Sequence, residues 1–312
     1  MVLQWVPKAA IEAEAEAEAE AETALSTVSR KRNTRIVVYH QTQYHNSTYI
    51  SLTPLLTQKT GVTHVILAAF HLNQPAGNIT LNDDPWDSSK YAPLWSEVRT
   101  LQSSSVRVMA MLGGAATGSF SSLDGSLAAF NAYYMPLSHM IRTLNLDGLD
   151  LDVEEAMSIG GIIRLVDRLH ADFGDEFLIT LAPVATALQG QQNLSGFDHE
   201  MLEKGLGHKI AWYNTQFYCG WGDLNSTRDY ERIIARGWPA EKVVLGLVTN
   251  PANGDGWVDD KVVKRTLTML VDKFPDFGGV MGWEYFNSVT EESPVVGKPW
   301  CWAQLMSEIL KT

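Results

Sequence analysis

Five acidic residues lie within nine positions in the segment LDGLDLDVEE, residues 146–155. Asp150, Asp152 and Glu154 alternate with apolar residues, and side chains two apart on a strand point to the same face. The three carboxylates would therefore share one face. Carboxylates crowded in a low-dielectric interior cannot all be ionised cheaply, so at least one pKa should be raised. A carboxyl group that holds its proton near neutral pH is what general acid catalysis requires.

An ion-paired or metal-binding cluster is the alternative use of so many acids. No second cluster of His or acidic residues supplies further ligands, so we expect no metal and no cofactor. The sequence also lacks a His-Glu-x-x-His pair, a Gly-x-Ser-x-Gly elbow, a Walker loop and a dinucleotide fingerprint. Acid catalysis by carboxyl groups is therefore the favoured chemistry, and the ion-paired or metal-binding cluster stays the alternative.

Eight short apolar runs recur along the chain, with segments of helical spacing between them. The runs cover residues 35–40, 64–72, 106–114, 146–154, 177–184, 210–218, 243–250 and 277–286. Apolar strands that alternate with helices imply a parallel sheet covered by helices, and eight such units predict a single α/β domain, a (β/α)8 TIM barrel over residues 33–312. A doubly wound open sheet is the alternative, but residues 37–46 contain no glycine for a nucleotide signature.

The barrel places the acidic segment on its fourth strand. Active sites of such barrels assemble at the C-terminal ends of the strands, where Glu154 lies. Asp152 and Asp150 would point into the barrel below it, while the intervening leucines face the helices. Asp147 is expected to cap or pair structurally.

The segment Asp147–Glu154 matches the Asp-Gly-x-Asp-x-Asp-x-Glu motif of glycoside hydrolase family 18, which contains chitinases and endo-β-N-acetylglucosaminidases. The chain resembles this family over residues 33–312. MLGG (111–114) is similar to the family's third strand end, QFY (216–218) to its sixth, and GVMGWEYF (279–286) to its eighth. The whole run resembles the short fungal endo-β-N-acetylglucosaminidases, which cleave N-glycans between the two core N-acetylglucosamines.

The resemblance implies a retaining mechanism in which the substrate's own 2-acetamido group replaces a protein nucleophile and forms an oxazolinium intermediate. Glu154 would protonate the glycosidic oxygen, and Asp152 would orient the acetamide. Asp150 would tune the charge of Asp152. Tyr218 would donate a hydrogen bond to the acetamide oxygen, and Trp283 would form the apolar floor under the sugar.

Further candidates for substrate binding lie at strand ends or in the loops that follow: Gln216, Asn214, Tyr39, Phe70, Gly113, Gly114 and Trp221. Gln216 and Asn214 share the phase of Tyr218, but buried amides that satisfy backbone groups are an equal alternative. Tyr39 and Phe70 could equally belong to the core.

Three loop tryptophans, Trp86, Trp221 and Trp257, would give an extended carbohydrate cleft if they lie on one rim. Glu284 should point outward if Trp283 points inward, and it receives no role.

Two other functions stay open. A chitinase shares the catalytic strand, but the gap 251–276 is too short for the small extra domain of many chitinases, and MLGG lacks their serine before the glycines. We therefore expect an N-glycan or glycoprotein substrate, most simply a high-mannose glycan. A non-catalytic lectin or inhibitor would have lost the acid, the tyrosine or the central aspartates, and all are retained here.

Composition limits the partners. The net charge of −12 leaves no basic stripe for a nucleic acid, and no run approaches the roughly 18 apolar residues of a membrane span. We expect a monomer that binds neither.

Residues 1–32 are expected to form a separate Ala/Glu-rich leader or pro-segment, disordered or helical. Four N-x-Ser/Thr sequons, at Asn46, Asn78, Asn193 and Asn225, favour secretion, although no signal peptide is visible and a cytosolic location is the alternative. Cys219 and Cys301 allow one disulfide or two buried thiols.

Overall fold

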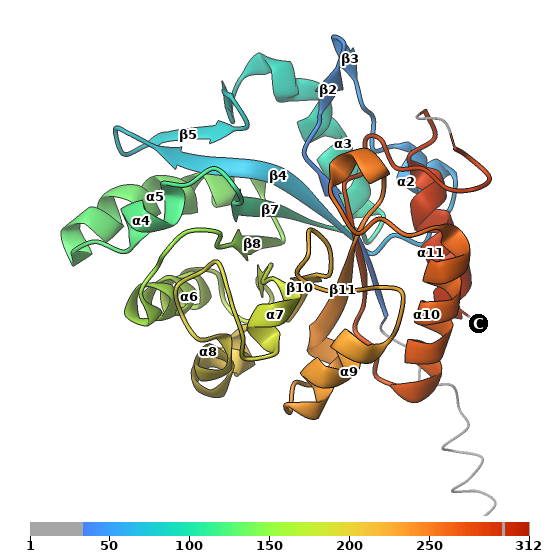
Figure 1. Ribbon diagram of the computed structural model, residues 1–312. Helices are drawn as coiled ribbons and strands as arrows, with labels where there is room; N and C mark the ends of the chain where they lie inside the picture. The colour runs from blue at the N-terminus through green and yellow to red at the C-terminus, as the bar shows by residue number, and fades with distance from the viewer. Residues whose placement is uncertain (1–33, 295–296, 312) are drawn as a thin grey trace, which may run out of the picture. The chain divides into compact units, whose positions relative to one another are not determined.

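A closed barrel of eight parallel strands forms the centre of the structure (Figure 1). The computed structural model describes residues 34–294 and 297–311, so the expected leader lies outside the described residues. In order around the barrel, the strands are β1 (Arg35–His40), β4 (His64–Asn73), β7 (Arg107–Gly113), β8 (Gly148–Asp152), β9 (Leu178–Leu181), β10 (Trp212–Gln216), β11 (Val243–Val248) and β12 (Gly279–Trp283). Strand β1 pairs with both β4 and β12, which closes the barrel.

Alternation along the strands creates two cores. One cluster fills the barrel interior and includes Val37, Ile66, Met109, Met111, Val244 and Met281. The other lies between the strands and the helices, where Leu149 and Leu151 of β8 belong to the same cluster as Ile162 and Leu165. The leucines of the acidic strand therefore face outward, and its aspartates face the interior.

Helices cover the outside of the barrel in Figure 1. They are α2 (Pro54–Thr57), α3 (Ala92–Ser103), α4 (Ser119–Leu123), α5 (Leu127–Leu144), α6 (Ile159–Phe173), α7 (Ala185–Leu188), α8 (His199–Leu206), α9 (Arg228–Ala235), α10 (Asp260–Lys273) and α11 (Trp300–Lys311), with 3₁₀ turns η1 (Ser89–Tyr91), η2 (Gly207–Lys209), η3 (Ala240–Lys242) and η4 (Pro251–Asn253). Several begin at side-chain caps, for example Ser158, whose hydroxyl accepts a hydrogen bond from Gly161 N at the start of α6.

Short strands extend the sheet beyond the barrel. Strand β4 continues into a hairpin with β5 (Asn78–Leu81), which pairs in turn with β6 (Asp84–Pro85). The loop after β1 forms a second small hairpin from β2 (Tyr44–His45) and β3 (Thr48–Tyr49). Both hairpins follow the C-terminal halves of barrel strands, so they add to the rim where the active site was expected.

The barrel and the absence of an insertion domain are confirmed. Between β11 and β12 the described chain contains only η4 and α10 besides its loops. Within residues 34–294 and 297–311, no helix combines the length and the hydrophobicity that a membrane span requires.

Candidate active site

Asp150 lies at the bottom of the acidic row and is fully buried. It accepts hydrogen bonds from Tyr39 Oη at 2.6 Å, Thr180 Oγ1 at 2.6 Å and Asn214 Nδ2 at 3.0 Å. Burial raises the pKa of the Asp150 carboxyl, and the hydrogen bonds from Thr180, Tyr39 and Asn214 oppose that rise because they favour the charged form. Asp150 is thus a buried acid held in place by three donors.

Asp152 stands between Asp150 and Glu154. Burial raises its pKa well above the ordinary value, and the charges of Glu154 and then Asp150 raise it further. Gln216 Nε2 lies 3.2 Å from Asp152 Oδ1 and 3.2 Å from Glu154 Oε1, and also donates to Ala182 O at 2.9 Å. The expectation of a raised pKa in this row is confirmed at Asp150 and Asp152, and Gln216 bridges the two upper acids.

Gly113 and Gly114 carry the end of β7 past Asp152. Gly113 has φ +95°, and a β-carbon there would lie 2.4 Å from Phe120 Cε2 and 2.5 Å from Asp152 O. Gly114 N donates to Asp152 O at 2.8 Å. No side chain fits at Gly113 without a shift of its neighbours, so a glycine lets the backbone of β7 approach the acidic strand.

A cavity of about 460 Å³ opens above these acids. Its walls include most of the residues that the sequence assigned to catalysis or binding: Asp152, Glu154, Tyr218, Trp283, Gln216, Gly113, Gly114 and Trp221. Tyr218 follows β10 and is buried beside the acids, and burial together with the charges of Asp152 and Glu154 raises its pKa. The structure therefore brings Glu154, Asp152, Tyr218 and Trp283 into one cavity.

Three expected binding residues are placed elsewhere. The assignment of Phe70 as a substrate contact is wrong, because its side chain is fully buried in the outer core between strands and helices. Tyr39 and Asn214 do not line the cavity either: both lie beneath it and donate to Asp150. They support an acid from below, and Tyr39 also packs against Trp283 with ring centroids 5.6 Å apart.

The loop tryptophans differ in part from expectation, whereas Asp147 does not. Trp221 lines the cavity, whereas Trp86 packs against the outer core and Trp257 is exposed outside the cavity wall. The expected row of three is therefore not formed around this cavity. Asp147 has the structural role expected of it, since its carboxylate accepts from Val108 N at 2.7 Å and pairs with Arg107 at 3.0 Å.

Several residues of the site were missed. Thr180 holds Asp150, and its signal was a lone hydroxyl within the apolar run 177–184. Asn253 lines the cavity and donates to Trp283 O at 2.9 Å, which fixes the backbone of the expected floor. Glu284 is buried and accepts from Gln41 N, Thr42 N and Thr42 Oγ1 at 2.9, 2.9 and 2.7 Å, so it clamps the loop after β1 to the end of β12.

Within the described residues, the cysteines form no disulfide and the acids form no metal site. Cys219 and Cys301 are both free, and Cys219 is exposed at the cavity wall rather than buried. Within the described ranges, no group of three or more His, Cys, Asp or Glu side chains is arranged to hold a metal ion. The acids of the row instead accept hydrogen bonds, Asp150 from three donors and Asp152 and Glu154 from Gln216.

Comparison with known proteins identifies the family. Residues 35–303 match the family model for glycosyl hydrolases family 18. The chain belongs to glycosyl hydrolase family 18. It is 56% identical to a chitinase from Aspergillus fumigatus of known structure, with 88% of this chain and 99% of that one covered and a TM-score of 0.82.

Two further relatives frame the question of substrate. A fungal family 18 endo-β-N-acetylglucosaminidase of known structure is 46% identical, with 89% of this chain and 98% of that one covered and a TM-score of 0.85. An acidic endochitinase from Nicotiana tabacum is 27% identical over 234 residues, which cover 68% of this chain and 74% of its own. The protein is a family 18 glycoside hydrolase, and its relatives include enzymes named for both substrates.

Proposed function

We propose that this family 18 glycoside hydrolase is a retaining endo-β-N-acetylglucosaminidase that cleaves the GlcNAc-β1,4-GlcNAc core of N-glycans, high-mannose glycans first. The observation that carries the proposal is the absence of an inserted domain from the described chain between β11 and β12. Only η4 and α10 stand between β11 and β12, so no inserted domain lengthens the cavity above Trp283 into a deep groove for a linear polymer. The similarity in fold to the fungal endo-β-N-acetylglucosaminidase supports the same assignment.

In the proposed reaction, Glu154 protonates the oxygen that links the two sugars. It lies at the mouth of the barrel in the cavity wall, where a glycosidic oxygen can reach it, and Gln216 fixes its carboxyl group. A positioned acid of this kind contributes roughly 10²–10⁴-fold to rate.

The substrate's acetamide oxygen then attacks the anomeric carbon, and the leaving sugar keeps the proton. Asp152 accepts the acetamide N–H and holds the carbonyl oxygen in line, while the buried hydroxyl of Tyr218 donates to that oxygen. Asp150 stays below, fixed by its three donors, and sets the field on Asp152. Water opens the oxazolinium ion with retention, and Glu154 accepts the proton from that water.

A chitinase is the second candidate because the Aspergillus fumigatus chitinase is the more identical of the two solved fungal relatives described above. Both activities use the same acids and differ in what flanks the scissile bond. A non-catalytic lectin is a weaker alternative, since Glu154, Asp152 and Tyr218 are retained and meet in one cavity.

The test compares two substrates. The protein is incubated with a high-mannose glycoprotein and, separately, with chitin oligomers, and products are identified by mass spectrometry. The proposal expects single GlcNAc residues left on the asparagines of the glycoprotein. Release of chitobiose from the oligomers with an unaltered glycoprotein establishes the chitinase instead, and binding without any product establishes a lectin.

We also propose that the protein is secreted, acts as a monomer and meets its glycoprotein substrates outside the cell. The sequon asparagines Asn46, Asn78 and Asn225 are exposed, and Asn193 is partly exposed, so an N-glycan could be attached without unfolding the barrel. Recovery of the protein from the culture medium of its native host supports secretion, and recovery from the cytosol alone contradicts it.

A further inference from the structure

The segment LDGLDLDVEE contains a fifth acid, Glu155, which has no part in the proposed reaction. It follows Glu154 directly in the chain, in the loop between β8 and α6. Its side chain is partly buried, but it is not among the residues that line the catalytic cavity. Glu155 therefore makes no contact with a sugar in that cavity, and any influence on the reaction must act through its neighbours.

The carboxylate of Glu155 binds the start of α4. Its Oε1 atom accepts hydrogen bonds from Gly118 N at 2.9 Å and from Phe120 N at 2.8 Å. The first amides of a helix have no partner within the helix, and a carboxylate beside them is favourable. These two hydrogen bonds connect the loop that carries Glu154 to the loop after β7.

Helix α4 has other contacts that hold it in place. Phe120 and Leu123 are fully buried in the outer core, between the strands and the helices. Ser119 Oγ accepts a hydrogen bond from Leu72 N of β4 at 3.0 Å. The helix is therefore a fixed support, and the loop after β8 is the part whose position depends on Glu155.

The position of Glu154 depends on its backbone. Its carboxyl group accepts a hydrogen bond from Gln216 Nε2 at 3.2 Å, which is at the long end of the normal range. On the C-terminal side of Glu154, the first hydrogen bonds that hold the described chain are those of Glu155. The next is made by Met157 N, which donates to Ser195 O at 3.0 Å. Glu155 is thus the nearest anchor of this loop to the acid.

We propose that Glu155 is a positioning residue for Glu154: by binding the amides of α4, it fixes the backbone from which the carboxyl group of Glu154 reaches the glycosidic oxygen. This inference rests on the proposed function only in that Glu154 is the acid, and it applies equally to an N-glycan and to chitin. An acid must lie within hydrogen-bond reach of the oxygen that it protonates, and a displacement of about 1 Å can lower the rate roughly 10²-fold.

The test separates protonation of the leaving group from the rest of the reaction. It measures kcat/KM on a high-mannose glycopeptide, on a chitin pentamer, and on the two 4-nitrophenyl glycosides in which 4-nitrophenol replaces the sugar on the leaving side. A sugar alkoxide is a strong base and leaves only when an acid protonates it, whereas 4-nitrophenolate is a weak base and leaves without a proton. Displacement of Glu154 should therefore affect the sugar substrates selectively.

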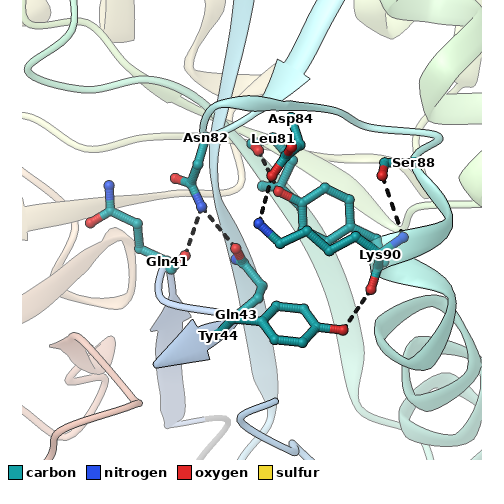
Figure 2. Close-up of polar contacts among 9 residues, drawn as sticks. Gln41, Gln43, Tyr44, Leu81, Asn82, Asp84, Ser88 and Lys90 are labelled. Carbon is teal, nitrogen blue, oxygen red and sulfur yellow. Dashed lines mark hydrogen bonds and ion pairs between the residues drawn. The ribbon is translucent and has the colours of Figure 1, made fainter. Parts of the chain in front are cut away.

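The variants differ in whether they keep an acceptor for the amides of α4. Glu155→Ala removes both hydrogen bonds, while Glu155→Gln keeps one oxygen that can accept both. Asp84→Ala is the matched control, because it also removes one negative charge and one contact between two segments, the ion pair with Lys90 at 2.5 Å that Figure 2 shows. Asp84 does not line the catalytic cavity. Glu154→Gln gives the dependence on the leaving group when the acid is absent, and thermal unfolding verifies that each variant is folded at the assay temperature.

On the sugar substrate that wild type cleaves, we expect Glu155→Ala to lower kcat/KM by about 10–100-fold, and on the matching 4-nitrophenyl glycoside by less than about threefold. Glu155→Gln and Asp84→Ala should stay within about threefold of wild type on both substrates. Equal losses by Glu155→Ala on both substrates would show a general loss of structure and would overturn the inference. No loss on either substrate would overturn it as well.

The same measurements keep the inference apart from the proposed function. Cleavage of the chitin pentamer alone would contradict the proposed function, and the comparison of leaving groups on chitin would still decide the role of Glu155. If wild type cleaves neither sugar substrate, both are overturned.

Discussion

Asp152 is the residue on which the electrostatics of the site depend. It is buried between two other acids, and its only side-chain hydrogen bond within the described part of the chain comes from Gln216, which is shared with Glu154. Asp150, in contrast, has three donors of its own. Burial, and then the charges of Glu154 and Asp150, raise the pKa of Asp152 well above its ordinary value of 3.8. The carboxyl that should orient the acetamide is therefore destabilised as an anion by its burial and by its acidic neighbours.

This burial predicts a pH-dependent effect of Asp152→Asn. Because the folded-state pKa of Asp152 is raised, its contribution to stability is fully present below about pH 3.8 and is lost as the pH rises through the raised value. The asparagine variant does not have this loss. We expect the melting temperature of the variant minus that of the wild type, measured by calorimetry, to increase from pH 4 to pH 8. The activity of the variant should be lower than that of the wild type. A difference in melting temperature between the two proteins that does not vary with pH would show that the pKa of Asp152 is not raised in the folded state.

At the scale of the element, the glycine at the end of β7 allows the backbone of this strand to lie close to the acidic strand β8. Gly113 leaves no room for a β-carbon between Phe120 and the backbone of Asp152. Gly118, further along the same loop, also has a positive φ, +121°, but a β-carbon there would meet no atom within 4 Å. Both positions therefore carry the backbone strain of a positive φ, but only Gly113 adds steric overlap when it is replaced by alanine.

Gly113→Ala should therefore destabilise the protein by about 1–3 kcal/mol more than Gly118→Ala, because only the first adds overpacking to backbone strain. Urea unfolding of the two variants measures the difference, and kcat should fall for Gly113→Ala because Asp152 is displaced. Equal free energies of unfolding for the two variants would mean that β7 shifts to accommodate the added methyl group without loss of stability.

The sequence predicted the acidic strand well because its spacing is local. Alternation alone places Asp150, Asp152 and Glu154 on one face, and the inward face follows from the outward leucines. The partners of Asp150 depend instead on strand register: Asp150 is paired with Thr180 across β8 and β9, and no local pattern sets that alignment. Phe70 was misplaced because the pairing of β4 with β7 shifts between Leu67 and Phe70, which ends the simple alternation.

At the scale of the whole molecule, buried histidines limit stability in acid. His40 is fully buried at the end of β1, and neither ring nitrogen has a hydrogen-bond partner among the described residues. Burial lowers its pKa from 6.5 to about 3, and burial lowers that of His199 to about 4. The unfolded chain therefore takes up protons below pH 6.5 that the folded barrel does not.

The contribution of His40 is fully present above pH 6.5 and is lost as the pH falls toward its folded value, by up to about 1.4 kcal/mol for each pH unit. His40→Leu should remove this term, so the variant should lose less free energy of unfolding than wild type between pH 6.5 and pH 4.5 in urea titrations. An identical loss in the two proteins would place the acid sensitivity elsewhere.

The choice of substrate also depends on the whole molecule. The family motif and the barrel follow from the sequence, but the shape of the cavity above the acids depends on how several loops meet beyond the strand ends. Such packing is not encoded in any one segment, so sequence patterns could indicate an acid-catalysed glycosidase and not the shape of the glycan it accepts.

Replacement of Glu154 by glutamine tests the central claim most directly, because the amide keeps the shape of the side chain and cannot donate the catalytic proton. Turnover of a high-mannose glycopeptide and its binding affinity are measured side by side for the variant and the wild type. The account predicts a fall in kcat of about 10²–10⁴-fold with Kd nearly unchanged. Hydrolysis at the wild-type rate by Glu154→Gln would contradict it.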